Sequence, residues 1–131
     1  MSKALLYAAN TSTQAYVATG TVINFGNVVR RYGSNVNLSG GNISVNGSGY
    51  YNIDTNFTFN GAAGTATIQL YKDGVAIPGA VATQVESATG TYAVTIPAVI
   101  REVCCCESTI TAVISGVAGN VTNAAIVVEK A

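Results

Sequence analysis

Apolar and polar residues alternate along much of this chain with a period of two, which is the pattern of strands that bury one face. The clearest run lies between residues 50 and 59, where odd positions are apolar and even positions are mostly polar. We predict a half-buried strand there, because successive side chains of a strand point to opposite faces of its sheet.

A second alternating run covers residues 65–72 and ends at Asp73-Gly74, a dipeptide that favours a two-residue hairpin turn. The return strand, residues 75–85, contains Pro78-Gly79. Since proline cannot donate a hydrogen bond to a strand ladder, this stretch is an edge strand, a bulge or a second turn.

Several further windows are candidate strands, and none shows the pattern of an amphipathic helix. These windows are residues 92–98, 109–114, 123–130, 4–9, 22–29, 36–38 and 43–45. About eight to ten strands, with turn signals roughly every 8 to 12 residues, predict an all-β fold, an antiparallel two-sheet sandwich. The apolar sides of the runs are the expected core: Tyr51, Ile53, Phe57, Phe59, Ile68, Leu70, Val94, Ile96, Ile110 and Ile114.

The two ends of the chain depart from this alternation. Residues 4–9 and 124–128 are apolar at nearly every position. A strand needs such a sequence only if both of its faces are covered. We therefore expect the first and last strands to lie side by side in one sheet, with one face toward the core and the other toward a neighbouring subunit.

The composition supports a covered surface. The chain has 131 residues, of which 49% are hydrophobic and only 9% are charged. Ordinary soluble proteins have about 25% charged residues. A single domain spanning residues 1–131 is large enough to form its own core, and the scarcity of charge suggests that another subunit covers part of its surface.

The same composition argues against several partners. Six basic and six acidic residues give a net charge of zero, so no basic patch is expected to attract nucleic acid. No apolar stretch reaches about 18 residues, so membrane insertion is not expected. The N-terminal apolar run is too short for a signal peptide, and we expect synthesis to end in the cytoplasm. A virion or a spore or cell surface is the expected final location.

Catalytic chemistry has few candidate residues in this sequence. The chain has no histidine, which removes the usual general base, the common nucleophilic triads and most zinc sites. Asp54 lies on the polar face of the strand at residues 50–59, and we interpret it as part of a polar network between subunits. The other acidic residues are interpreted as solvated. We predict no catalytic, cofactor-binding or metal-binding residues, and we do not expect an enzyme.

The three cysteines are consecutive, Cys104, Cys105 and Cys106. This spacing fits neither a disulfide framework nor a zinc site. One interpretation is that they are free thiols that pack as small hydrophobic side chains. In a trimer, another is that one of them meets its two copies near the three-fold axis, where thiols could pack, bind a soft metal or link chains.

Two short motifs resemble a known family. Gly49-Tyr50-Tyr51-Asn52-Ile53 resembles the Gly-x-Tyr-x-Phe strand of the trimeric jelly rolls that include tumour necrosis factor and the complement and collagen-like globular heads. Leu70-Tyr71-Lys72-Asp73-Gly74 is similar to the Lys-Asn-Gly hairpin of that family. The chain looks most like its small bacterial, spore-surface and phage-encoded members. The resemblance implies a jelly-roll topology and a homotrimer whose first, last and residue 50–59 strands share the sheet nearest the three-fold axis.

The predicted trimer interface combines the apolar chain ends with the polar face of the strand at residues 50–59 and the outer face of the penultimate strand. Its candidate residues are Leu5, Tyr7, Tyr50, Asn52, Asp54, Thr109, Thr111, Val113, Ala125 and Val127.

Two functions fit these expectations. The first is a structural or adhesive homotrimer of a phage, spore or cell surface that recognises a glycan or protein receptor through its loop tips. The alternative is a soluble trimeric module that binds a ligand in a pocket between subunits. No cofactor is expected for either function.

Overall fold

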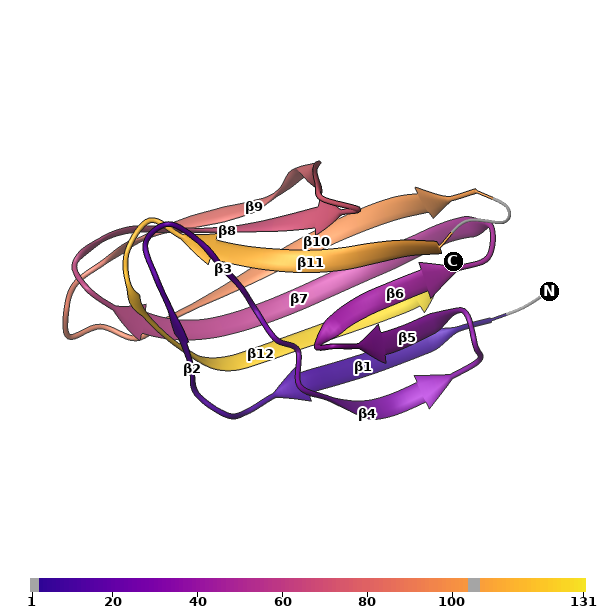
Figure 1. Ribbon diagram of the computed structural model, residues 1–131, viewed down its shortest axis with the longest axis horizontal. Coiled ribbons are helices and arrows are strands. Elements are labelled where there is room, and N and C mark those ends of the chain that lie inside the picture. The colour runs from indigo at the N-terminus through magenta and orange to yellow at the C-terminus, as the bar shows by residue number, and fades with distance from the viewer. Residues whose placement is uncertain (1–2, 104–106) are drawn as a thin grey trace.

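The computed structural model describes residues 3–103 and 107–131, and every regular element in these residues is a β-strand (Figure 1). Twelve strands form two six-stranded antiparallel sheets, so the predicted all-β sandwich is confirmed, with more strands than expected. The sheet that we name the front sheet lies farther from the viewer in Figure 1 and has the order β10 (Tyr92–Glu102), β7 (Gly49–Gly61), β12 (Gly119–Lys130), β1 (Leu5–Asn10) and β4 (Asn27–Tyr32), with β2 (Gln14–Tyr16) paired to β12. The back sheet has the order β5 (Val36–Ser39), β6 (Asn42–Asn46), β11 (Glu107–Ser115), β8 (Gly64–Lys72) and β9 (Val75–Glu86), with β3 (Thr21–Val22) paired to β11.

The chain passes repeatedly from one sheet to the other, which is the connectivity of a jelly roll. From β7 in the front sheet it forms β8 and β9 in the back sheet, then returns for β10, crosses again for β11 and ends in the front sheet with β12. The first and last strands, β1 and β12, pair directly, as the apolar chain ends predicted. Strand β12 also pairs with β7, so the three strands expected to share a sheet do so.

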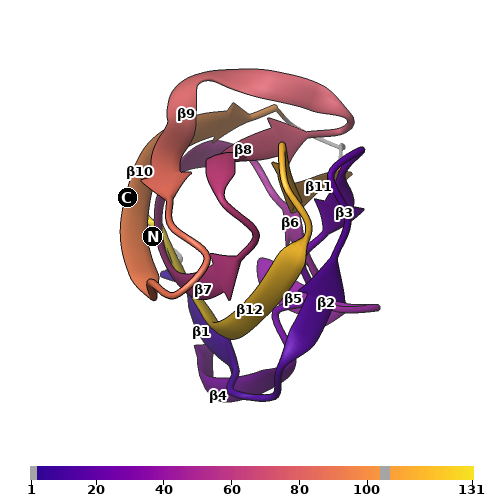
Figure 2. The same cartoon turned by 90° about the vertical axis from the view of Figure 1, so that its left-hand side faces the viewer.

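The core fills the space between the two sheets (Figure 2). Nine of the ten residues predicted for it are buried, and the tenth, Val94, is partly buried and packs against the others. Phe25 joins them, and its ring centroid lies 5.9 Å from that of Phe57. A bulge in β12 between Val121 and Asn123 shifts the alternation, so that both Val121 and Ala124 face the core. The period-two pattern therefore identified the inner faces of the long strands correctly.

The predicted hairpin joins β8 to β9. Asp73 and Gly74 have φ angles of 52° and 79°, the left-handed conformations that a type I′ turn requires at both central positions. The turn is also tied to β11, because the backbone N–H of Asp73 donates to the Thr109 carbonyl (2.9 Å) and the Thr109 N–H donates to Asp73 Oδ1 (2.9 Å). Pro78 lies within β9, which is the edge strand of the back sheet, and the pairing of β9 with β8 shifts register at residues 77–80, so both the edge-strand and the bulge interpretations of Pro78-Gly79 are confirmed.

The expected strand at residues 22–29 is wrong as a single element. The chain leaves β3 at Val22, passes through an irregular segment that buries Ile23 and Phe25, and enters β4 in the other sheet. Gly26 marks the change of direction with a φ of 75°, and a Cβ at this position would lie 2.5 Å from the Ala9 carbonyl oxygen. Strand-forming residues lie on both sides of Gly26, but the backbone turns at this glycine, so the two segments cannot form one strand.

Candidate subunit interface

The outer face of the front sheet brings together residues from four neighbouring strands in regular rows. Strand register places Tyr7, Val127, Asp54 and Pro97 side by side across β1, β12, β7 and β10. The rows on either side of it contain Leu5, Glu129, Asn52 and Val99, and Ala9, Ala125, Asn56 and Thr95. Each of these residues follows the alternation of its strand, since its chain neighbours face the core.

Seven of the ten predicted interface residues lie on this face: Leu5, Tyr7, Tyr50, Asn52, Asp54, Ala125 and Val127. The other three, Thr109, Thr111 and Val113, belong to β11 and lie on the outer face of the back sheet. The ten residues therefore do not share one face of the sandwich, and their meeting in a trimer interface stays a prediction. The pattern of β11 shows which of its residues face outward, but it does not show which sheet the strand joins.

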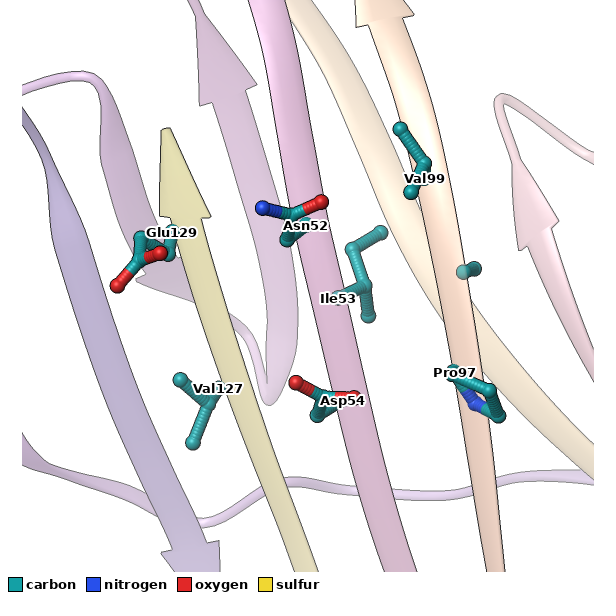
Figure 3. Close-up of a pocket in the computed structure, with 8 residues that line it drawn as sticks. Asn52, Ile53, Asp54, Pro97, Val99, Val127 and Glu129 are labelled. Atoms are coloured by element: carbon teal, nitrogen blue, oxygen red, sulfur yellow. The ribbon is translucent and has the colours of Figure 1, made fainter. Parts of the chain in front are cut away.

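The outer face of the front sheet is hollowed along β7, between β12 and β10. One groove of about 480 Å³ is lined by Asn52, Asp54, Pro97, Val99, Val127 and Glu129, among others (Figure 3). A second hollow of about 320 Å³ continues from it and shares Asp54, Pro97 and Val127. The predicted interface did not include Pro97, Val99 and Glu129. The alternation of their strands could have identified them, because each lies an even number of residues from an outward-facing residue of the same strand.

A second group of exposed apolar residues lies where the edges of the two sheets meet. Strands β9 and β10 are neighbours along this edge of the sandwich (Figure 2). Val81 and Val85 of β9 are 44% and 71% exposed, and Val99 of β10 is 61% exposed. Val99 belongs to the outer face of the front sheet described above, whereas Val81 and Val85 alternate with inward-facing residues of β9 and point outward from the back sheet.

Two acidic side chains are buried, which contradicts the expectation that they are solvated. Glu86 and Glu102 are only 4% and 2% exposed. Glu86 ends β9 at one end of the sandwich, where the Tyr16 hydroxyl lies 3.3 Å from the Asn60 carbonyl and 3.5 Å from Glu86 Oε2. Glu86 Oε1 has no hydrogen-bond partner among the residues that the structure describes. The alternation of β9 could have predicted this burial, because Glu86 lies an even number of residues after the buried Ala80 and so points to the same face of the strand.

Burial changes the pKa values of Glu86 and Tyr16. Burial raises the pKa of Glu86, and the hydrogen bond from Tyr16 opposes this effect in part. Burial, followed by the charge of Glu86 and the hydrogen bond to it, raises the pKa of Tyr16 to about 12. The folded protein therefore favours the protonated forms of both side chains.

Glu102 lies at the opposite end of the sandwich, where β10 pairs with the first residue of β7. Burial and the nearby charge of Glu102 raise the pKa of Tyr51, whose hydroxyl lies 2.9 Å from the carbonyls of both Asn46 and Gly47. Tyr51 and Asn60, which mark the two ends, are separated by about 30 Å along the extended strand β7. A pair of catalytic carboxylates must lie within about 10 Å of each other, so Glu86 and Glu102 cannot act as one.

Residues 3–103 and 107–131 contain no group of three or more histidine, cysteine, aspartate or glutamate side chains placed to hold a metal ion. They also contain no helix long and apolar enough to cross a bilayer. Cys104, Cys105 and Cys106 lie outside the described residues.

The sandwich is a TNF-like jelly roll, and similar solved structures cover almost the whole chain. Murine APRIL has a TM-score of 0.78 and 13% identity, over 99% of this chain and 100% of its own. The globular domain of zebrafish complement 1qA has a TM-score of 0.68 and 11% identity, over 95% and 94%. The PRD1 vertex protein P5 has a TM-score of 0.66 and 16% identity, over 97% and 96%. No family model and no curated protein matches the sequence. The fold expected from the sequence resemblance is confirmed.

Proposed function

We propose that this chain is a non-catalytic homotrimeric module, a structural or adhesive component of a phage particle or of a spore or cell surface that recognises a glycan or protein. The observation that carries the proposal is the outer face of the front sheet, where apolar residues from the first and last strands lie beside a hollowed strand. On this proposal the protein is made in the cytoplasm and reaches its surface by assembly.

A cyclic trimer requires two different patches on each subunit, because each interface joins one patch to the other. The outer face of the front sheet supplies an apolar patch around Tyr7 and Val127. Val81 and Val85, on the edge strand β9, supply the second. Burying both patches would reduce the apolar surface that a chain with only 9% charged residues presents to water.

Two observations support the surface role: the loops that a trimer would repeat, and the name of one protein with a similar structure. A trimer repeats each loop three times, so that weak binding at one loop tip is strengthened by the other two. One protein with this fold is a vertex protein, a component of a particle. Mass spectrometry of purified virions or spores tests this part of the proposal, and absence of the chain from all such particles would contradict it.

The trimer is tested by placing a charge on each face of the sandwich in turn. Val127→Lys would bury an unpaired charge between subunits, at a cost of several kcal/mol, and should give folded monomers by light scattering and circular dichroism. Thr111→Lys adds the same charge to the outer face of the back sheet and should leave the trimer intact. Val128→Lys places the charge in the core, since Val128 is fully buried, and should prevent folding.

The three variants give distinct outcomes. A folded monomer from Val127→Lys alone supports an interface on the front sheet. A stable monomer of the unmodified protein at micromolar concentration would contradict the trimer, and a trimer lost only with Thr111→Lys would place the interface on the back sheet instead.

The alternative function, a soluble module with a ligand pocket between subunits, is favoured by the grooves along β7. In a trimer the neighbouring subunit would close these grooves, and Asn52, Asp54 and Asn56 would be their polar groups. Native mass spectrometry of the trimer tests this alternative, because a retained small molecule in fixed ratio to the trimer would support it.

A further inference from the structure

The outer face of the back sheet carries a polar groove that the proposed trimer does not use. It has a volume of about 320 Å³, which is at the lower end of the range of about 300–1,000 Å³ for small-molecule sites. Three neighbouring strands, β5, β6 and β11, build it. Its lining residues are Asn37, Ser39, Asn42, Ile43, Ser44, Glu107 and Thr109.

Strand register explains why these polar groups converge. Asn37, Ser44 and Thr109 lie in one row across the three strands, because Ser44 pairs with both of the others. Ser39 pairs with Asn42 beside this row, and Glu107 lies two residues before Thr109 on the same face of β11. Side chains at alternate positions of neighbouring strands are about 5 to 8 Å apart, so one small ligand can reach several of them.

One wall of the groove is held in place by its own contacts. The Arg31 guanidinium donates to Asn37 Oδ1, and Asn37 Nδ2 donates to the Ser34 carbonyl at 3.2 Å. Asn42 and Ser44 are half-buried in the groove, whereas Glu107 and Thr109 are exposed at its side. The side chain of Ile43 is fully buried, so this residue presents only backbone to the groove.

The chemistry of the lining selects a class of ligand. Neutral amides and hydroxyls both donate and accept hydrogen bonds, and the carboxylate of Glu107 accepts them. The lining contains no lysine or arginine to bind a phosphate or carboxylate, and no apolar side chain to bind a hydrophobic ligand. We propose that this groove binds a neutral saccharide, whose neighbouring hydroxyl groups also donate and accept in pairs.

Tyr71 lies on the same outer face of the back sheet as the groove, outside the groove's lining. It lies on β8, directly opposite Thr111, and Thr111 is two residues from Thr109 on the outer face of β11. An aromatic ring beside a row of polar groups can cover the apolar face of a sugar ring while the polar groups bind its hydroxyls. Tyr71 is therefore placed to extend the site for a saccharide longer than the groove.

The inference deepens the proposed function, since it names the receptor class and places its site on a sheet face instead of a loop tip. The groove lies on the opposite side of the sandwich from the front sheet. A trimer that covers the front sheet would leave three such grooves open to the outside, and three weak sites together bind a repeated surface glycan more tightly than one.

Titration with neutral monosaccharides, followed by ¹H–¹⁵N NMR of the full chain, tests the site. A hexose, a 6-deoxyhexose and an N-acetylhexosamine are the probes, and a sialylated trisaccharide is the charged comparison. We expect shifts of the amides in β5, β6 and β11 with at least one neutral sugar. Asn42→Ala and Thr109→Ala should each weaken its binding by about threefold to tenfold, as for the loss of one hydrogen bond. Thr83→Ala, on the outer face of β9 outside the groove, should leave the affinity unchanged.

Each result has a definite meaning. Shifts confined to the groove and weakened by both groove variants support the proposal, and an array of neutral polysaccharides and protein-linked glycans then identifies the source of the sugar. No binding of any neutral sugar, or binding that both groove variants leave unchanged, would overturn it. Light scattering on the same samples separates the two proposals, because a trimer without sugar binding refutes only the groove, and a monomer that binds sugar refutes only the trimer.

Discussion

The buried carboxylate of Glu86 makes the stability of this fold depend on pH in a direction that is unusual for an acidic residue. Most paired carboxylates stabilise a fold when they are ionised. Glu86 is 4% exposed, Oε1 has no partner among the described residues, and Oε2 has only the Tyr16 hydroxyl at 3.5 Å. Burial raises the pKa of Glu86 above its ordinary value of 4.5. Its contribution to stability is therefore complete below pH 4.5 and is lost as the pH rises through the pKa of the folded state.

We expect Glu86→Gln to remove this loss. A buried charged acceptor without a full set of partners costs about 1–3 kcal/mol or more, so the variant should gain about this free energy of unfolding at pH 8. At pH 4 the carboxyl is neutral in the folded chain and mostly neutral in the unfolded chain, so the two proteins should have nearly equal stability. The ionisable groups that act with Glu86 are the hydroxyls of Tyr16 and, more weakly, Tyr92.

The measurement is urea denaturation at pH 4, 6 and 8, followed by circular dichroism because the chain has no tryptophan. Protein concentration is held constant, since a trimer unfolds at a denaturant concentration that depends on it. Glu107→Gln is the matched control, because it removes a carboxylate from an exposed position. A Glu86→Gln variant that is less stable than the unmodified protein at pH 8, or whose difference from it is the same at pH 4 and pH 8, would refute the reasoning.

Two further predictions concern the backbone and the alkaline limit of stability. Gly116→Ala should cost about 2 kcal/mol or more, because Gly116 has a φ of 105° and a Cβ there would lie 2.1 Å from the Thr65 carbonyl oxygen. Gly40→Ala, at a φ of 60° with no atom within 4 Å of the added Cβ, should cost only about 1 kcal/mol in thermal or urea unfolding. Tyr16, with a pKa raised from 10.0 to about 12, stabilises the fold fully below pH 10, and up to about 3 kcal/mol should be lost as the pH rises through 12. Tyr16→Phe should show less of this alkaline loss when the two proteins are compared at pH 9 and pH 11.5, and an equal loss in both would contradict the assignment.

Local alternation was enough to predict the long strands and their inner faces, although not the break in the expected strand at residues 22–29. The strand expected at residues 50–59 is β7, and Tyr51, Ile53 and Phe57 face the core as the pattern indicated. The hairpin at Asp73-Gly74 followed in the same way, because a dipeptide that tolerates two left-handed residues specifies the turn by itself. These features depend only on neighbours in the chain, which the sequence shows directly.

The position of charged residues was harder to predict from the pattern. Both buried acids stand at the ends of strands, where Glu86 and Glu102 follow small or apolar residues of the same parity. Acidic residues in general are mostly exposed to solvent. The alternation of β9 and β10, in contrast, indicates that Glu86 and Glu102 point toward the core. The alternation predicted the burial of these two residues better than their residue type did, since a side chain at a strand end still points to the face that its backbone position dictates.

The sequence by itself determined that this protein is an antiparallel sandwich with apolar first and last strands, because strand periodicity and turn chemistry are local properties. Only the tertiary structure decided which strands share a sheet. It separated Thr109, Thr111 and Val113 from Val127, and it placed β5, β6 and β11 side by side to form the polar groove. The physical reason is that an outward side chain looks the same in sequence on either sheet, while the surface it joins depends on hydrogen-bond pairing between segments far apart in the chain.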